Sequence, residues 1–222
     1  MATNTMNLPL SQESRKSETT RLVRWLPSLL WILAAVLLLV SIAFPYWGMV
    51  LQAPQYPGGL QMRVFVNRMT GDENPQLDEV HEIDELNHYI GMKSLYEAAP
   101  VERALSIPGI IASAVLLAVA ALWRRRWTWL LALPPLTIPV FFLGVMGLWL
   151  RDYGQNLDPY APLSSAIHPF TPPVLGEGTI GQFKTIASVD TGWYLALAAV
   201  VLIVAGLALR YLSSRTKGGA NA

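Results

Sequence analysis

The sequence contains no cysteine, and this absence excludes several kinds of site. Disulfide bonds, thiolate metal sites and iron–sulfur clusters all require cysteine, and c-type haem attachment requires two cysteines before a histidine. Charge is also scarce, since 14% of the 222 residues are Asp, Glu, Lys or Arg, against about 25% in soluble domains. The net charge of +1 gives no reason to expect a nucleic-acid partner. A chain that is 53% apolar is instead expected to contact membrane lipids.

The apolar residues fall into four runs without charged residues, each close to the roughly 20 residues that a membrane-spanning helix needs. Seven of the eight tryptophans lie at or near the ends of these runs, where membrane–water interfaces favour indole rings. The first run follows basic residues, as a signal peptide does, but it is longer than a signal core and lacks a cleavage pattern, so we expect it to be retained. We predict transmembrane helices at 26–46, 104–123, 127–150 and 193–209.

The distribution of charge predicts the orientation of these helices. Segments 1–25, 124–126 and 210–222 together hold ten Lys and Arg and two Glu. Loops 47–103 and 151–192 hold six Lys and Arg and thirteen Asp and Glu. The positive-inside rule therefore predicts that both termini and the short turn are cytoplasmic and that the two acidic loops lie outside.

The predicted spans lack the ionisable groups with which pumps and proton-coupled transporters move charge. They also lack the histidines that bind b-type haem within a bilayer, because all three histidines fall in the outer loops. Pro134, Pro135 and Pro139 either kink the third span or open a cavity in it. A small-molecule permease is therefore a weaker alternative. No nucleophile–base pair, phosphate-binding glycine loop or nucleotide fingerprint is present, so no catalytic residue is predicted.

The first outer loop carries the candidate metal ligands. A rigid turn is expected at 53–59, a strand at 60–67 and a helix at about 77–92, ended by glycine. On that helix His81, Glu85 and His88 share one face, and Met92 follows one turn later. Imidazole, carboxylate and thioether together favour copper. The alternative interpretation is a solvated acidic helix face with two incidental histidines.

The second outer loop is rich in proline and glycine, which predicts an extended, irregular segment. It nevertheless carries apolar and aromatic residues, so we expect it to pack on the first loop as one outer cap. His168 would then approach His81 and His88. The predicted fold is an all-α integral membrane protein with four transmembrane helices and a small mixed α/β extracytoplasmic cap.

Several strings in the loops resemble a known family. They are Pro45-Tyr46-Trp47, Ala53-Pro54-Gln55-Tyr56-Pro57, Leu86-Asn87-His88-Tyr89-Ile90-Gly91-Met92, Pro169-Phe170-Thr171-Pro172-Pro173 and Ile180-Gly181-Gln182-Phe183. This combination resembles the NosB-like family of small bacterial membrane proteins, which accompany gene clusters for copper-dependent respiration, most closely those of nitrous oxide reductases. The resemblance covers both outer loops and the flanking spans, about two thirds of the chain.

The resemblance implies an accessory role in the bacterial cytoplasmic membrane, such as anchoring, maturing or supplying electrons to an external copper enzyme of denitrification. It adds weight to copper binding at His88 and Met92, which lie inside the family string. A non-catalytic structural subunit of a larger respiratory or oxygenase complex is the alternative. In either case, the residues expected to dock a partner are Tyr56, Asn87, Tyr89, Phe170 and Phe183.

Overall fold

The computed structural model describes residues 10–72, 77–123, 125 and 127–218. The helices and strands of these residues are α1 (Leu10–Ser41), β1 (Trp47–Ala53), β2 (Tyr56–Val64), β3 (Met69–Thr70), α2 (Glu79–Ile90), α3 (Pro100–Leu122), α4 (Leu133–Gln155), β4 (Gly176–Ile180), β5 (Phe183–Val189) and α5 (Thr191–Gly218), with short 3-10 helices at Leu95–Glu97 and Thr128–Ala132. About 58% of the described residues are helical, but a five-stranded antiparallel sheet accompanies the helices. The expected all-α class is therefore corrected to a helical membrane protein with a β-sheet head, a name we use for residues 47–72, 77–99 and 156–190.

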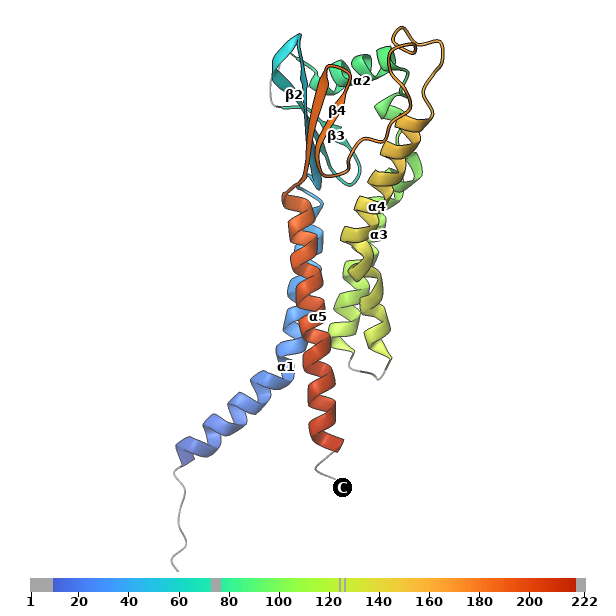
Figure 1. The fold of residues 1–222 in the computed structure, drawn as a ribbon. Coiled ribbons are helices and arrows are strands. Elements are labelled where there is room, and N and C mark those ends of the chain that lie inside the picture. Colours follow the sequence, from blue (N-terminus) through green and yellow to red (C-terminus); the bar gives the residue numbers. More distant parts are fainter. Residues whose placement is uncertain (1–9, 73–76, 124, 126, 219–222) are drawn as a thin grey trace, which may run out of the picture.

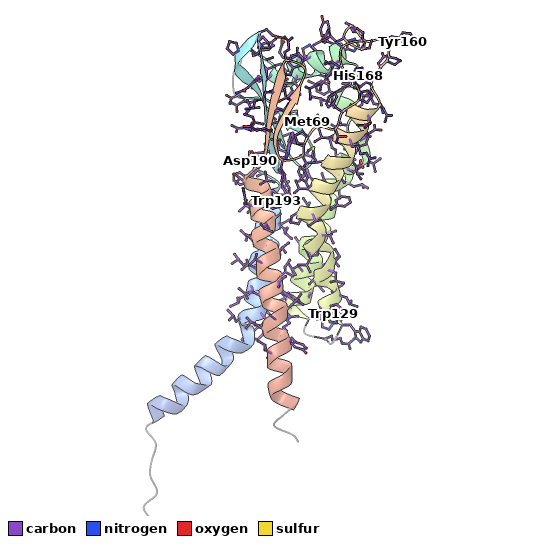
Figure 2. The ribbon with its side chains drawn as sticks, in the orientation of Figure 1. Met69, Trp129, Tyr160, His168, Asp190 and Trp193 are labelled. Carbon is purple, nitrogen blue, oxygen red and sulfur yellow. The ribbon has the colours of Figure 1, made fainter. Side chains whose placement is uncertain are left out.

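The long helices form two pairs, α1 beside α5 and α3 beside α4, with the sheet and α2 gathered at one end (Figure 1). Among the described residues, three helices are long and apolar enough to cross a membrane: Pro100–Leu122, Thr128–Gln155 and Thr191–Ser213. The apolar part of α1, Trp25–Ser41, is shorter. Figure 2 shows Trp193 where α5 meets the head and Trp129 at the opposite end of the helices. Interfacial tryptophans at both ends are typical of membrane proteins.

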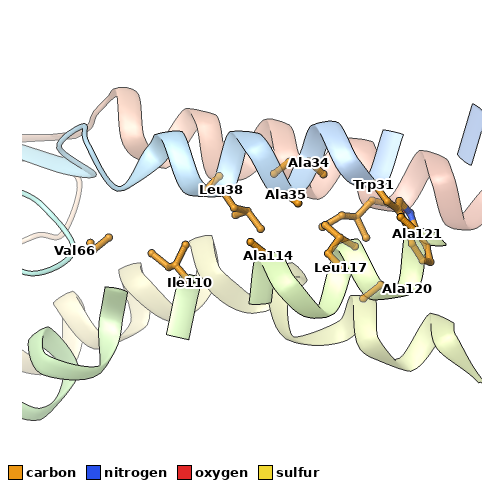
Figure 3. Close-up of a cluster of buried hydrophobic side chains, with 14 of the residues drawn as sticks. Trp31, Ala34, Ala35, Leu38, Val66, Ile110, Ala114, Leu117, Ala120 and Ala121 are labelled. Atoms are coloured by element: carbon orange, nitrogen blue, oxygen red, sulfur yellow. The ribbon is translucent and has the colours of Figure 1, made fainter. Parts of the chain in front are cut away.

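Small residues allow the helices to approach one another closely. Alanines of α1, α3 and α5 are buried at the helix contacts, and the large side chains of Trp31, Leu38 and Leu117 fill the space between them (Figure 3). In lipid, helices associate through such close van der Waals packing rather than through the hydrophobic effect. This cluster therefore holds α1, α3 and α5 together.

Arg210 joins these three helices at the end far from the head. Its Nη2 donates to the carbonyl of Ala120 at 2.9 Å, near the end of α3 where helix carbonyls lack intrahelical partners. Its guanidinium carbon also lies 3.8 Å from the ring centre of Trp31 on α1, within the range of a cation–π interaction. Ser28 of α1 completes the junction by donating to the carbonyl of Ala121 at 2.7 Å.

The sheet has the strand order β3-β2-β1-β5-β4. β1 and β2 form a hairpin, and so do β4 and β5, while β1 pairs antiparallel with β5 from Trp47 opposite Val189 to Gln52 opposite Lys184. The two loops that the sequence predicted to pack together are thus parts of one sheet.

Short backbone hydrogen bonds connect the head to the α1–α5 pair. Tyr46 follows α1, and its carbonyl accepts from the Asp190 amide at 3.0 Å just before α5 begins. The Gly192 amide donates to the Pro45 carbonyl at 2.7 Å. A side chain at position 192 would strike the Tyr46 ring, because an added β-carbon would lie 2.5 Å from its Cδ2. The paired helices α1 and α5 therefore lead directly into the paired strands β1 and β5.

The structure differs from the sequence-based expectation in two places. The turn between the first two strands occupies only positions 54 and 55, so β2 begins at Tyr56, inside the segment expected to turn. The second loop, expected to be irregular, forms β4 and β5. Two of its glycines have positive φ: Gly176 at the start of β4 and Gly181 in the turn between β4 and β5. Because they lie where a strand begins or the chain turns, these glycines are compatible with the hairpin.

Candidate functional site

The Leu86–Met92 string forms the end of α2 and the turn that follows it. Gly91 ends the helix in a left-handed conformation with φ 86°, which glycine adopts without steric cost. The Met92 amide donates to the Asn87 carbonyl at 2.9 Å, and the Gly91 amide donates to the His88 carbonyl at 3.1 Å. These bonds satisfy carbonyls that the helix end would otherwise leave without partners.

Backbone hydrogen bonds hold the segment between α4 and β4, which we call the second segment, against this turn. The Asp158 amide donates to the Gly91 carbonyl at 2.8 Å, and the Leu163 amide donates to the Tyr89 carbonyl at 3.1 Å. A β-carbon at position 91 would lie 2.8 Å from the carbonyl oxygen of Asp158, so closeness as well as conformation requires glycine here. We call residues 88–92 and 158–163 the tip.

Tyrosine side chains are exposed on both segments of the tip. Tyr89 is 51% exposed and Tyr160 is 93% exposed, and Leu163 adds an apolar group. Figure 2 places Tyr160 at the outer edge of the head, with His168 nearby on the same end of the molecule. Exposed tyrosines on a hydrogen-bonded support are common anchors of protein–protein interfaces. No sequence pattern distinguished Tyr160, because its exposure depends on how the second segment folds over α2.

The predicted metal ligands do not form one cluster. His81 and Glu85 form an exposed pair with Nε2 and Oε1 3.9 Å apart, and His168 is exposed on the other segment. His88 and Met92 do line one small cavity of about 340 Å³, together with Asn156 and Asp158 of the second segment. In the part of the chain that the structure describes, no group of three or more His, Cys, Asp or Glu is placed to hold a metal. His88 and Met92 thus share a cavity that the other three predicted ligands do not line.

Carboxylates near these residues on α2 stabilise the head. Asp84 accepts from the Leu95 amide at 2.6 Å and from the Ser94 hydroxyl at 2.8 Å, which caps the short 3-10 helix. Glu82 accepts a hydrogen bond from the phenol of Tyr56. That bond raises the pKa of Tyr56 above its ordinary value, because it favours the neutral phenol.

The five residues predicted to dock a partner have different environments. Phe183, the first residue of β5, is buried in an apolar cluster, and Phe170 packs against the same cluster. Tyr56 and Asn87 are half-buried. Only Tyr89 of this set is exposed, so it is the one that the structure presents to solvent.

A larger apolar cavity of about 610 Å³ lies between the sheet and the α3–α4 pair. Its walls come from the sheet (Met62 and Val64), from α3 (Ile110) and from α4 (Ile138 and Phe142). The prolines of the third predicted span do not create it by breaking a helix. Pro134 and Pro135 stand at the start of α4, where a missing amide costs nothing, and α4 continues through Pro139 to Gln155.

No protein-family model matches this chain, and no curated protein is significantly similar to it.

Replacing Gly91 with alanine is expected to loosen the tip. The left-handed φ and the contact with Asp158 should together cost about 2 kcal/mol or more of stability. Hydrogen exchange of the 158–163 amides should accelerate and the thermal midpoint in detergent should fall. Gly58→Ala is the matched control, because its β-carbon has no atom within 4 Å. Equal stability of the two variants would refute this account of the tip.

Proposed function

We propose that this chain is a non-catalytic accessory protein of the bacterial cytoplasmic membrane, whose head docks an extracytoplasmic copper enzyme at the tip. The observation that carries the docking proposal is the exposed pair Tyr89 and Tyr160 on two segments that hydrogen bonds hold together. Aromatic side chains on a rigid support lose little conformational entropy on binding. The choice of a copper enzyme, of nitrous oxide reductase type, rests on the family resemblance of the loop strings.

The proposed topology has four spans, because we add α1 to the three helices that are long and apolar enough to cross a membrane. Trp25–Ser41 is shorter than the other three apolar helices, but its buried residues from Trp31 to Leu38 belong to the cluster that packs α1 against α3 and α5. Both termini and the arginine turn are cytoplasmic in this topology, because the basic residues gather there. The head then lies outside, where its excess of carboxylates favours a partner with basic residues at its docking surface.

Copper handling is a second role for the tip, favoured by the shared cavity of His88 and Met92. Neutral imidazole and thioether are both ligands that bind copper, and a thioether favours Cu(I). Further ligands would have to come from the docked enzyme.

The orientation can be tested with single cysteines, since the chain has none of its own. Tyr160→Cys is expected to react with a membrane-impermeant maleimide in intact spheroplasts, because it lies 93% exposed on the head. Trp127→Cys, beside the arginine turn and 70% exposed, should react only after the membrane is permeabilised. The reverse pattern would put the head in the cytoplasm and end the proposal of an external partner.

Docking can be tested by purifying the full-length chain from native membranes in mild detergent. We expect a copper enzyme to co-purify, and the double variant Tyr89→Ala/Tyr160→Ala to retain at least tenfold less of it, because two interface hot spots of about 1–2 kcal/mol each together exceed the roughly 1.4 kcal/mol of a tenfold change. Tyr194→Ala is the control, since this residue is similarly exposed but lies on α5. Equal recovery from all three proteins would exclude the tip as the docking surface.

The same preparations separate docking from copper handling. If the chain handles copper, His88→Ala/Met92→Ala should leave the enzyme bound but lower its copper content. Unchanged copper in that variant would assign the chain to anchoring alone. Partners that co-purify without any copper would instead support the structural-subunit alternative.

A further inference from the structure

The apolar cavity between the sheet and the α3–α4 pair has the dimensions of a lipid-binding site. Its volume of about 610 Å³ falls within the roughly 300–1,000 Å³ of small-molecule sites. Along α3 it extends from Val101 to Ser113, which is about 18 Å at 1.5 Å per residue. This length is close to the roughly 15 Å that half of a 30 Å hydrocarbon core provides.

The cavity opens toward the position of lipid chains. Three of its lining residues, Val101, Leu105 and Phe141, are 62–63% exposed although their side chains are apolar. Large exposed apolar groups on a membrane helix contact hydrocarbon rather than water. These side chains therefore join the lipid-facing surface of α3 and α4 to the apolar lining of the cavity, which includes Met62 and Val64 of the sheet.

Charges of both signs stand at the head-side rim of the same cavity. Glu102 and Arg103 occupy the first turn of α3 and both line it. The Trp149 indole donates to Glu102 Oε1 at 3.4 Å, and Arg103 Nη2 donates to the Tyr96 carbonyl at 2.7 Å. These contacts fix the two groups while leaving the carboxylate a second oxygen and the guanidinium further N–H groups for a ligand.

We propose that this cavity binds one phospholipid with a zwitterionic headgroup from the leaflet on the head side. One acyl chain lies in the apolar cavity, the phosphate accepts hydrogen bonds from Arg103, and the ammonium group pairs with Glu102. Opposite charges on adjacent residues match a zwitterion better than an anionic headgroup, which Glu102 would repel. The lipid would fill the space between the sheet and the α3–α4 pair.

Native mass spectrometry of the full-length chain with added phosphatidylethanolamine tests the site. The wild-type protein should hold one lipid per chain. Gly109→Leu should reduce the bound fraction roughly tenfold by displacing about two methylene groups, because Gly109 lines the cavity and an added β-carbon there has no atom within 4 Å. Ser106→Leu, one turn earlier on the same wall, should have a similar effect.

Gly144→Leu is the matched control. It makes the same chemical change on α4, also with no atom within 4 Å of the added β-carbon, at a position outside the cavity lining. It should bind lipid as the wild type does, and both glycine variants should elute as folded protein on size exclusion.

Three results would overturn the proposal. Equal lipid retention by all variants would mean that only surrounding membrane lipid is bound. If phosphatidylglycerol bound as tightly as phosphatidylethanolamine, and Glu102→Gln did not change this preference, the proposed recognition of a zwitterionic headgroup would be wrong. Retention of an isoprenoid quinone in place of phospholipid would assign the cavity to another class of ligand.

Discussion

The pairing of β1 with β5 is the interaction on which the rest of the structure depends. These strands are far apart in the sequence: β1 follows α1, and β5 leads into α5. The bonds that link Tyr46 with Asp190 and Pro45 with Gly192 carry the pairing across the junction. The head therefore cannot rotate freely on its helices, because two adjacent connections hold it.

The other parts of the head follow from that pairing. α2 covers the sheet with Val80, Ile83 and Ile90, and its end supports the second segment through the tip. The α3–α4 pair stands beside the sheet without contributing a strand, which leaves the apolar cavity between them. The proposed docking surface and the proposed lipid site meet at Met92, which belongs to the tip and also lines the apolar cavity.

Local patterns in the sequence predicted the parts of the fold that local forces determine. The helix at about 77–92 was recognisable from the spacing of its apolar residues and from Gly91, and the structure confirms it as Glu79–Ile90 with Gly91 as its cap. β5 was missed because its strand depends on pairing with β1, more than a hundred residues away in sequence, and glycine- and proline-rich segments precede it. His88 and Met92 line one cavity, whereas the positions of His81 and His168 depend on tertiary packing that the spacing of residues in the sequence cannot give.

The β1–β5 register can be measured directly with paired cysteines, since the chain has no cysteine to interfere. Val50 and Ile186 are register partners, and opposite residues on one face of a sheet have β-carbons about 5 Å apart. Val50→Cys/Ile186→Cys should form a disulfide rapidly under mild oxidation in membranes. Val50→Cys/Thr185→Cys should not, because adjacent residues of a strand point to opposite faces. Cross-linking of the second pair alone, or of neither pair, would contradict the continuous sheet that joins the two loops.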